Sequence, residues 1–429
     1  MSEPAPVQCD LVVVGRGMAG MAATLFAANR GIDTIQVGMT GGTIFASGCL
    51  DLLAFPSPET KASFDDPWAA IDRLSQEMPG HPYTRMKREE MEAALDEFVS
   101  FLNGQGLTYV KQTGHNTEMI TPLGTVKQTY YAPESMWEGV KAFKEKAPCL
   151  LVDFYGMSDF SATQMAATLT DVWPNIRSAR VPFPGNSENR ELISGDIMAE
   201  AMELSKNREE LARAIRQLLG DAGVVGVPAV MGMNKTREIF SDMKDRIGVP
   251  LFEIPTFPVS VPGLRLNEAF ARGLSEKGVK RLSQTRVLGA DPSGDGTFVL
   301  HVGRREPEMT LHSRGVILAT GRFWSRGLVA HRNGIREPIF NLPVHQPEER
   351  GEWHQETFLD VKGHPVNRAG VEIDDLFRPL GETGKPAFER LFAAGAILAH
   401  QDWKRMKCGS GLAVGSAYAA VNAFLKKRH

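Results

Sequence analysis

Three glycines near the start of the chain have the spacing of a phosphate-binding turn. Gly15, Gly17 and Gly20 form a G-x-G-x-x-G pattern directly after the apolar run Leu11–Val14, and an alanine-rich stretch, 21–30, follows them. In this pattern the first glycine forms a tight turn, the second lets a phosphate approach the backbone, and the third lets helix and strand pack closely. The order of strand, glycine turn and helix therefore predicts nucleotide binding at a helix N-terminus, where free N–H groups point outward.

The residue that usually holds the ribose of a dinucleotide is missing. Such folds carry an Asp or Glu about 20 residues after the glycines, at the end of the second strand. Here the second strand is expected at 32–37, and the sequence at its end, Val37-Gly38-Met39, contains no carboxylate. Gln36 is either a weaker substitute or a solvated strand residue. The missing acid disfavours an adenosine-bearing cofactor and leaves a mononucleotide open.

Further small residues are expected to complete the cofactor site. Glycines and hydroxyl residues let the backbone approach a flat ring system, and a second helix N-terminus would stabilise negative charge on a reduced flavin. A surface loop and close helix packing are the alternative explanations. The candidates are Gly41, Gly42, Ser47, Gly48, Gly395, Gly409, Ser410 and Gly411.

Basic residues crowd the segment after the apolar strand 316–319. Ligands of open α/β sheets bind beyond the carboxyl ends of strands, and arginine forks bind phosphate oxygens bidentately. Arg332 and Arg336 are therefore candidates for binding the phosphate of an anionic substrate. Ion pairs with neighbours such as Glu337 are the alternative.

Two histidines are candidate proton acceptors. His331 directly precedes Arg332, and His400 lies near the C-terminal glycines. Imidazole is the commonest general base near neutral pH. Each histidine also fits a purely structural role.

The composition excludes several classes of function. The chain has 429 residues, 23% of them charged, and a net charge of −3 without a basic stripe, so binding to nucleic acid has no electrostatic support. No run approaches the roughly 20 apolar residues of a membrane span. The N-terminus lacks the basic region of a signal peptide, which makes the cytosol the expected location. Cys9, Cys49, Cys149 and Cys408 are scattered, so we expect buried thiols and no metal or iron–sulfur site in this chain.

The middle of the chain reads as alternating helices and strands. Apolar residues at helical spacing predict one helix beginning near Lys87 and a long one over 195–219. The run 224–231 reads as a strand, and a helix over 236–247 ends at Gly248.

This alternation predicts an α/β protein: a Rossmann-type flavin-binding domain with an inserted α/β cap domain. We expect the flavin-binding domain to be built from residues 1–60, 264–335 and 376–429. The cap is expected at 61–263, with a return at 336–375.

Motifs spread over the whole chain are specific enough to indicate a family. They are Val13–Gly20, Ser47–Leu53, His81–Tyr83, Thr121–Thr125, Gly327–Ala330, Arg332–Ile339, Arg350–Trp353 and Leu391–Gly395. In these motifs the chain resembles, from end to end, the B subunit of the anaerobic glycerol-3-phosphate dehydrogenase.

The resemblance implies a flavoprotein with a cap domain that oxidises sn-glycerol 3-phosphate to dihydroxyacetone phosphate in anaerobic respiration. It implies FMN as the cofactor, in agreement with the missing ribose carboxylate, and FAD is the alternative because the fold usually holds FAD. Flavin folds of this type often carry an acid where this chain has Ala396, so the usual ribitol contact is missing.

The resemblance also implies partners within one complex. A catalytic flavoprotein subunit and an iron–sulfur subunit are expected, and the iron–sulfur subunit would anchor the complex to the membrane. Electrons would pass to menaquinone and then to fumarate or nitrate. This chain would be cytoplasmic, peripheral to the inner face of the membrane, and without a span of its own.

Two functions stay open. In the first, the flavin takes hydride from the substrate, His331 or His400 takes the hydroxyl proton, and Arg332 and Arg336 hold the phosphate. In the second, the chain is a flavin-bearing electron relay or structural subunit, and the partner flavoprotein carries the substrate chemistry.

Overall fold

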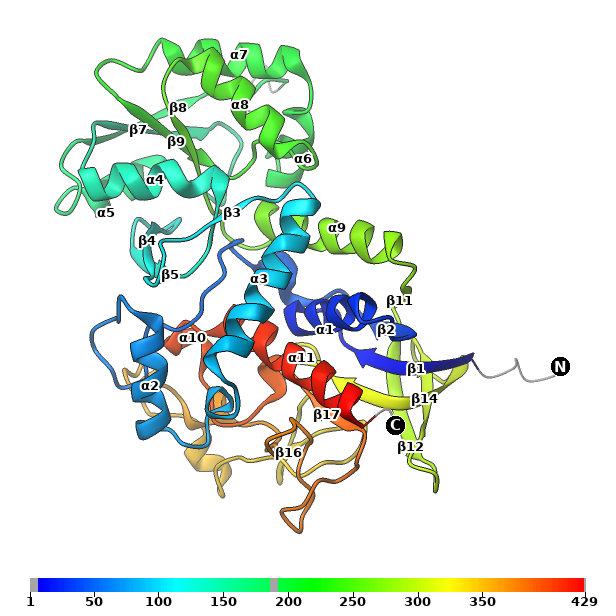
Figure 1. The fold of residues 1–429 in the computed structure, drawn as a ribbon. Helices are drawn as coiled ribbons and strands as arrows, with labels where there is room; N and C mark the ends of the chain where they lie inside the picture. The colour runs from blue at the N-terminus through cyan, green and yellow to red at the C-terminus, as the bar shows by residue number, and fades with distance from the viewer. Residues whose placement is uncertain (1–6, 186–191, 428–429) are drawn as a thin grey trace. The chain divides into compact units, whose positions relative to one another are not determined.

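The chain folds into two compact units. A computed structural model describes residues 7–185 and 192–427. The expectation about a signal peptide rests on the first residues, of which 1–6 lie outside this description. Within the described residues, unit 1 comprises 7–42, 51–98 and 270–427, and unit 2 comprises 43–50, 99–185 and 192–269. Figure 1 shows the ribbon with its element labels.

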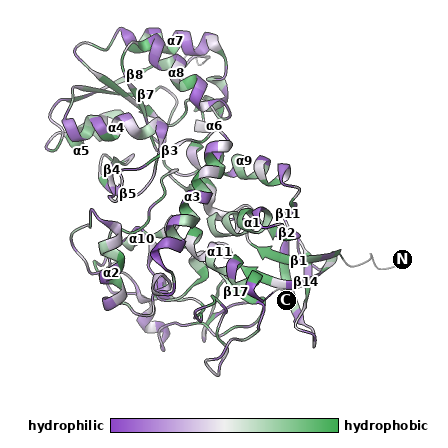
Figure 2. Cartoon of the chain, viewed as in Figure 1, coloured by the Kyte–Doolittle hydropathy of each residue, from purple (hydrophilic) through white to green (hydrophobic). Residues whose placement is uncertain are grey.

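Unit 1 is built on a parallel sheet. Its strands are β1 (Val7–Val14), β2 (Thr34–Gly38), β11 (Lys280–Ser283), β14 (Met309–Leu318) and β17 (Leu391–Ala393). β1 lies between β2 and β14, β11 pairs with β2, and β17 pairs with the second half of β14. Figure 2 shows β1 in the colour of hydrophobic residues. Leu11–Val14 are buried, which confirms the strand predicted from the apolar run.

An antiparallel meander extends this sheet. The strands β12 (Arg286–Pro292) and β13 (Phe298–Gly303) form a hairpin, and β13 pairs with the first half of β14. The first half of β14 therefore lies between β13 and β1, and its second half lies between β17 and β1.

Two helices of unit 1, α1 and α11, pack on the parallel sheet. The first crossover helix, α1, connects β1 to β2 and packs against the C-terminal helix α11, as expected for a Rossmann-type unit. Among the described residues, no helix is long and apolar enough to cross a bilayer. The helices are α1 (Met18–Asn29), α2 (Pro67–Glu77), α10 (Trp403–Met406) and α11 (Gly409–Lys426), with short 3₁₀ turns at Pro82–Arg85, Arg350–Trp353, Pro365–Arg368 and Gly395–Ile397.

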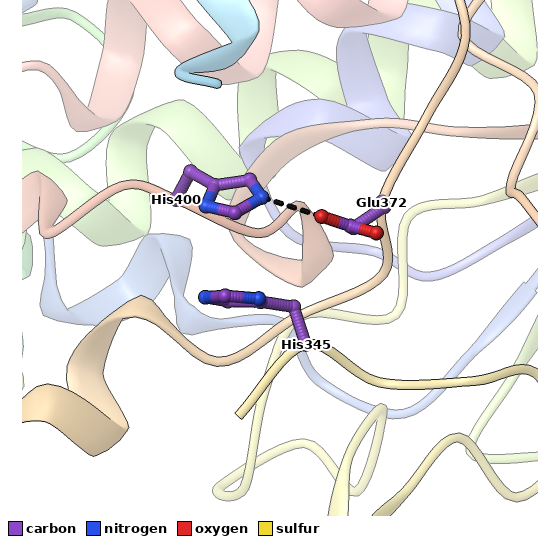
Figure 3. A group of neighbouring side chains, drawn as sticks. All are labelled: His345, Glu372 and His400. Atoms are coloured by element: carbon purple, nitrogen blue, oxygen red, sulfur yellow. Dashed lines mark hydrogen bonds and ion pairs between the residues drawn. The ribbon is translucent and has the colours of Figure 1, made fainter. Parts of the chain in front are cut away.

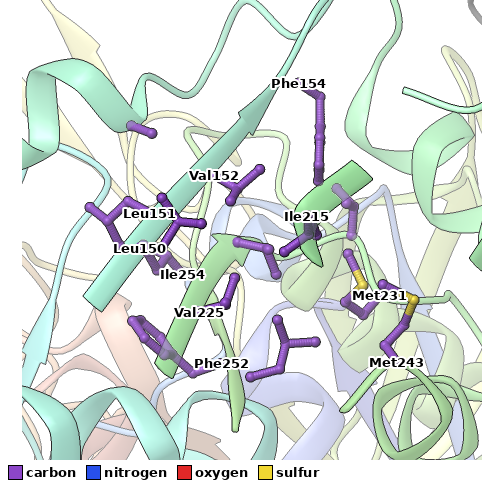
Figure 4. Packing of buried hydrophobic residues seen from close by; sticks show 14 of the residues in the cluster. Leu150, Leu151, Val152, Phe154, Ile215, Val225, Met231, Met243, Phe252 and Ile254 are labelled. Carbon is purple, nitrogen blue, oxygen red and sulfur yellow. The ribbon is translucent and has the colours of Figure 1, made fainter. Parts of the chain in front are cut away.

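Unit 2 is a second α/β unit inserted in the chain, as the sequence predicts. Its parallel sheet has the order β10–β9–β7–β8. Figure 4 shows strand residues such as Leu150, Val225 and Ile254 packing together with Ile215 and Met243 from two helices. The strands are β7 (Cys149–Phe154), β8 (Ile176–Val181), β9 (Val224–Pro228) and β10 (Leu251–Ile254).

Helices and short ribbons surround the sheet of unit 2. The predicted helix at 236–247 is confirmed, and it ends at Gly248, whose left-handed backbone closes the helix. The helices are α4 (Glu134–Glu145), α5 (Ala162–Leu169), α6 (Gly195–Ala201), α7 (Ser205–Arg216) and α8 (Thr236–Ile247), with a 3₁₀ turn at Gly42–Phe45. The ribbons pair β3 (Tyr109–Val110) with β6 (Ala132–Pro133) and β4 (Thr117–Ile120) with β5 (Val126–Thr129).

Two helices contain the boundary between the units. In α3 (Arg88–Gly104) and α9 (Val261–Glu276) the chain passes from one unit to the other. The helix predicted to begin near Lys87 is therefore confirmed as α3.

The single long helix predicted over 195–219 is wrong, because the chain forms α6 and α7 with a break between them. Leu204 has an extended backbone at the break. The guanidinium of Arg208 donates to the carbonyl oxygens of Met202 and Glu203, and the Glu203 carboxylate accepts three backbone N–H groups from 233–235. The hydrogen bonds of Arg208 satisfy carbonyl groups at the end of α6, and the Glu203 carboxylate satisfies N–H groups before α8. Helical periodicity reveals neither contact.

The units depart from the expected domain limits at four places. Residues 61–98 and 336–375 lie in unit 1, and 43–50 and 264–269 lie in unit 2. Long-range hydrogen bonds account for this: the Tyr83 hydroxyl donates to the carbonyl oxygen of Leu52 at 2.7 Å, and Leu50 forms a β-bridge with Tyr131.

Candidate functional site

The glycine turn at the start of α1 is shaped for a ligand. A Cβ at Gly15 would overlap the carbonyl oxygen of Ala319, and a Cβ at Gly20 would overlap that of Gly15. A Cβ at Gly17 would meet no atom within 4 Å. Gly17 is also the N-cap of α1 and makes no side-chain cap hydrogen bond. Two glycines thus permit close packing, while the third borders open space beside unsatisfied N–H groups that suit a phosphate.

Arginine occupies the region where the ribose carboxylate is missing. A Cβ at Gly38 would lie 3.1 Å from Cγ of Arg16. Gln36 is fully buried, so its interpretation as a solvated residue is wrong. Its amide nitrogen donates to the carbonyl oxygen of Gly15 at 3.3 Å, and its amide oxygen accepts from Nε of Arg281 at 3.0 Å. The side-chain oxygen of Gln36 is therefore occupied by a hydrogen bond from an arginine.

Among the described residues, neither Arg16 nor Arg281 has a carboxylate partner. Burial lowers the pKa of Arg16. Burial, and then the charge of Arg16, lower the pKa of Arg281 to about 10. Nε of Arg16 and Nη2 of Arg281 are buried and have no hydrogen-bond partner. Across residues 7–185 and 192–427, neither arginine forms a salt bridge.

Gly41 and Gly42 differ in their surroundings. A Cβ at Gly41 would overlap the backbone of Arg16, whereas a Cβ at Gly42 would meet nothing within 4 Å. Gly41 therefore lets the segment after β2 lie against the glycine turn.

Ser47 and Gly48 belong to unit 2. The carbonyl oxygen of Gly48 accepts from the Tyr109 hydroxyl at 2.7 Å, and the Ser47 hydroxyl accepts from the N–H of Cys49 at 3.4 Å. Gly48 has a positive φ of 86°, a backbone conformation that favours glycine. A cofactor role of these two residues stays a proposal.

The C-terminal glycines have packing roles in the structure. A Cβ at Gly395 would lie 2.5 Å from Cβ of Ala19, so this glycine lets its loop contact α1. A Cβ at Gly409 would crowd the ring of Trp403, and one at Gly411 would crowd the Tyr83 hydroxyl. Close packing thus explains Gly409 and Gly411, and Ser410 lies half-buried between them at the start of α11.

Arg322 fixes the loop that follows β17. Its guanidinium donates to the carbonyl oxygens of Ala396 at 2.7 Å, Gln401 at 2.8 Å, and Asn367. Burial lowers its pKa to about 10. Among the basic residues that follow strand 316–319, Arg322 therefore has a structural role.

The candidate substrate-binding arginines lie on an exposed hairpin of β15 (Val329–His331) and β16 (Gly334–Arg336). His331, Arg332 and Arg336 are all exposed. The suggested ion pair with Glu337 is wrong, because that carboxylate is buried and accepts two backbone N–H groups from the following turn, at 2.9 and 2.8 Å.

His400 belongs to a cluster that the sequence analysis did not find. Its Nε2 lies 2.8 Å from Oε1 of Glu372, and its ring lies 4.1 Å from that of His345, centroid to centroid (Figure 3). One ligand atom from each of the three residues lies within 4.8 Å of the others, so the cluster could also hold a divalent ion. The expectation of no metal considered only cysteines. Burial, and then the charge of His400, lower the pKa of His345, whereas Glu372 raises it.

Backbone pairing holds this cluster together. His345 forms a β-bridge with Gly370, and Val371 forms another with Leu398. Beside the cluster is a cavity of about 120 Å³, whose lining includes Glu372, His400 and Arg85. The three side chains come from separate segments without a recognisable motif, so only long-range pairing could reveal them.

Unit 2 contains a larger cavity of about 280 Å³. Its lining includes Tyr109, Arg237 and Lys244, together with Arg265. The Arg265 guanidinium forms two hydrogen bonds, of 2.8 and 2.9 Å, with the buried carboxylate of Glu253. Burial raises the pKa of Glu253, but the arginine outweighs burial and the pKa is lowered.

Comparisons with known proteins identify the family. The family described as FAD binding domain matches residues 10–412. The B subunit of the anaerobic glycerol-3-phosphate dehydrogenase of Vibrio vulnificus is 30% identical over 426 residues, covering 96% of this chain and 95% of the relative. The chain belongs to both families. A relative from Halobacterium salinarum, named as a probable B subunit of the same enzyme, is 29% identical and covers 99% of both chains.

Solved structures that the chain matches are more distant. A 3-ketosteroid delta1-dehydrogenase from Sterolibacterium denitrificans is 13% identical with a TM-score of 0.45, covering 98% of this chain and 100% of the other. A flavocytochrome c3 fumarate reductase is 11% identical with a TM-score of 0.42, covering 99% and 79%.

Family membership makes this chain a flavoprotein and confirms the predicted Rossmann-type flavin-binding fold. The family description names FAD, which the sequence analysis placed second to FMN. The open space at Gly17 and the uncapped start of α1 fit the phosphate of either flavin.

Proposed function

We propose that this chain is the flavin-bearing B subunit of a complex that oxidises sn-glycerol 3-phosphate to dihydroxyacetone phosphate in anaerobic respiration. The observation that carries the proposal is the match to the B-subunit relatives over nearly the full length of both chains. The glycine turn at α1 supports it with a place for the flavin phosphate.

His400 is the proposed proton acceptor, and Glu372 is its positioning residue. If Nε2 of His400 carries the proton that faces the Glu372 carboxylate at 2.8 Å, then Nδ1 keeps a free lone pair. The neighbouring ring of His345 restricts rotation of the imidazole. A bound flavin supplies the hydride acceptor for alcohol oxidation, and Nδ1 of His400 would take the hydroxyl proton. His331, the other candidate base, is exposed on the hairpin.

Arg332 and Arg336 are proposed to bind the substrate phosphate. Both side chains are exposed, and in the described parts of the chain neither forms a salt bridge. Two free guanidinium groups on one hairpin suit a phosphate dianion.

The cofactor and electron route are proposed from the family. FAD is the form that the family description supports, and FMN is the alternative. We propose a catalytic flavoprotein subunit and an iron–sulfur subunit as partners, with electrons passing to menaquinone and on to fumarate or nitrate. The chain would lie at the cytoplasmic face of the membrane through the iron–sulfur subunit. Its four cysteines are buried and widely separated in sequence, consistent with clusters carried by a partner.

A second candidate function is that of an electron relay or structural subunit, with substrate chemistry in the partner flavoprotein. The sequence supports it in one respect, because two acids that flavin folds of this type often carry are missing, at the end of β2 and at Ala396.

An anaerobic titration separates the two functions. Glycerol 3-phosphate is added to the purified, flavin-loaded chain alone while the flavin absorption band is followed. Bleaching supports oxidation by this chain, and loss of bleaching in His400→Gln, with flavin retained, supports the proposed base. Reduction that requires the partner flavoprotein supports the relay.

The phosphate-binding role is tested with Arg332→Ala. We expect weaker binding of glycerol 3-phosphate with unchanged flavin content. Arg305→Ala is the control, because Arg305 is an exposed arginine in the turn between β13 and β14. Equal kinetics for Arg332→Ala and the control would contradict the assignment.

A further inference from the structure

We propose that Arg16 and Arg281 bind a phosphate group of the flavin nucleotide. The proposal rests on the proposed flavin site and adds to it the residues that recognise the charged end of the cofactor. The shared chemistry is a phosphate oxygen, whether from the terminal phosphate of FMN or the diphosphate of FAD.

The position of the pair places it at the nucleotide end of the sheet. Arg16 is part of the glycine turn between β1 and α1, and Arg281 is paired in register with Gln36 on β2. Arg16 directly follows the carboxyl end of β1, where open α/β sheets bind ligands, and Arg281, the second residue of β11, is two residues before the position paired with the end of β2. The uncapped start of α1 is part of the same turn.

No carboxylate of the described residues neutralises the two guanidinium groups. Burial, and then the nearby charge of Arg16, lower the pKa of Arg281, in keeping with two like charges that face each other. In the described residues the polar side-chain partner of Arg281 is Gln36, whose amide oxygen is neutral. An anion between or beside the guanidinium groups would replace this repulsion with attraction.

Each arginine also has an unused donor. Nε of Arg16 and Nη2 of Arg281 are buried without a hydrogen-bond partner. Buried donors without a partner are rare in native proteins, and a ligand that binds beside them is one common explanation. Phosphate offers several acceptor oxygens, which matches these donors.

At the end of β2, this chain has guanidinium donors where dinucleotide-binding folds usually have a carboxylate acceptor. A carboxylate there would accept hydrogen bonds from ribose hydroxyl groups. In this chain the position is Gly38, and the stem of Arg16 lies beside it. Cationic hydrogen-bond donors therefore lie where a carboxylate acceptor would be, and such donors suit a phosphate group better than ribose hydroxyl groups.

The test compares three flavins that differ in phosphate. Riboflavin, FMN and FAD are titrated into the flavin-free full chain by calorimetry, using the natural sequence, Arg281→Gln and Arg16→Gln. We expect each variant to bind FMN, FAD or both about tenfold more weakly or worse, and riboflavin within about twofold of the natural chain. If the variants lose affinity mainly for FMN, the arginines bind the terminal phosphate of FMN. If they lose affinity mainly for FAD, the arginines bind the diphosphate.

Lys280→Gln is the matched control. Lys280 precedes Arg281 on β11 and is exposed, so its substitution removes the same charge from the opposite face of the strand. We expect flavin affinities within about twofold of the natural chain. The melting temperature of flavin-free Arg281→Gln should not fall, because repulsion from Arg16 is removed.

Two outcomes of the flavin titrations overturn the proposal. Unchanged FMN and FAD affinities in both arginine variants would do so, and so would an equal loss for riboflavin. If the natural chain binds none of the flavins, the proposed function fails. In that case inorganic phosphate serves as the probe, and a thermal shift that persists in Arg281→Gln, or no shift at all, rejects the arginine site.

Discussion

Nε2 of His400 lies 2.8 Å from Oε1 of Glu372, although the two residues are 28 positions apart in the sequence. His400 has a left-handed backbone with a φ of 62°, which is unusual for a residue other than glycine. Its N–H donates to the carbonyl oxygen of Arg368 at 3.0 Å. The surrounding backbone thus fixes this histidine in a conformation that aims its ring at the carboxylate.

Glu372→Gln tests the positioning role of this carboxylate. The amide cannot hold the imidazole in one tautomer as a carboxylate does, so we expect flavin reduction by glycerol 3-phosphate to slow by about 10- to 100-fold. The substrate concentration at half-maximal rate and the flavin content should stay close to those of the natural chain. Stopped-flow absorbance measures the rate. Glu382→Gln, which changes an exposed glutamate in unit 1, is the control, and a full rate in Glu372→Gln would contradict the role.

Gly17→Ala is expected to weaken flavin binding without destabilising the fold. Its Cβ meets no protein atom within 4 Å, and its φ of −78° is accessible to alanine. A methyl group would occupy the space through which a phosphate approaches α1. Calorimetry should show about a tenfold loss of flavin affinity or more, with little change in melting temperature of the flavin-free chain. Unchanged affinity would place the phosphate elsewhere.

Gly20→Ala should instead destabilise the protein itself. Alanine gains about 1 kcal/mol of helix propensity over glycine. That gain is outweighed, because the new Cβ would overlap the backbone oxygen of Gly15, and overpacking typically costs about 1–3 kcal/mol or more. Denaturant unfolding of the flavin-free chain measures the difference. A stability equal to that of Gly17→Ala would count against the close packing of α1 on the turn.

Arg322→Gln is expected to loosen the loop after β17. The guanidinium donates to three backbone carbonyl oxygens, and glutamine cannot span all three. We expect the free energy of unfolding to fall by about 3 kcal/mol or more, since hydrogen bonds from charged donors contribute about 1.5–3 kcal/mol each. Arg326→Gln, at an exposed arginine in the same segment, should have little effect.

The thiols should be unreactive in the native protein. Cys9, Cys49, Cys149 and Cys408 are buried, and burial raises the pKa of Cys9 to about 11 and that of Cys149 to about 12. An Ellman titration at pH 8 should therefore detect four thiols only after unfolding. A thiol that reacts quickly in the native chain would contradict this burial.

The same shifts predict a loss of stability at alkaline pH. The unfolded thiols ionise near their ordinary pKa of 9, whereas the folded thiols of Cys9 and Cys149 keep their protons to about pH 11 and 12. Stability is therefore fully present below pH 9 and falls as the pH rises through that window, because the unfolded state loses protons first. Unfolding free energies at pH 8 and pH 10 measure it. Cys149→Ala should flatten the slope.

The sequence predicted the features that depend on neighbours along the chain. The apolar run Leu11–Val14, the glycines Gly15, Gly17 and Gly20, and the helix after them are confirmed as β1, the turn and α1. Each step follows from local backbone geometry and from burial of a short apolar strand. The helix that ends at Gly248 was predictable for the same reason, since its end is a local left-handed cap.

Tertiary structure decided which distant side chains meet. His345, Glu372 and His400 converge because β-bridges align their segments, and Arg281 reaches Gln36 because β11 pairs with β2. The long helix expected over 195–219 is interrupted between α6 and α7, where Arg208 donates to the carbonyl oxygens of Met202 and Glu203. Such contacts depend on strand order and register, and single-sequence periodicity carries neither.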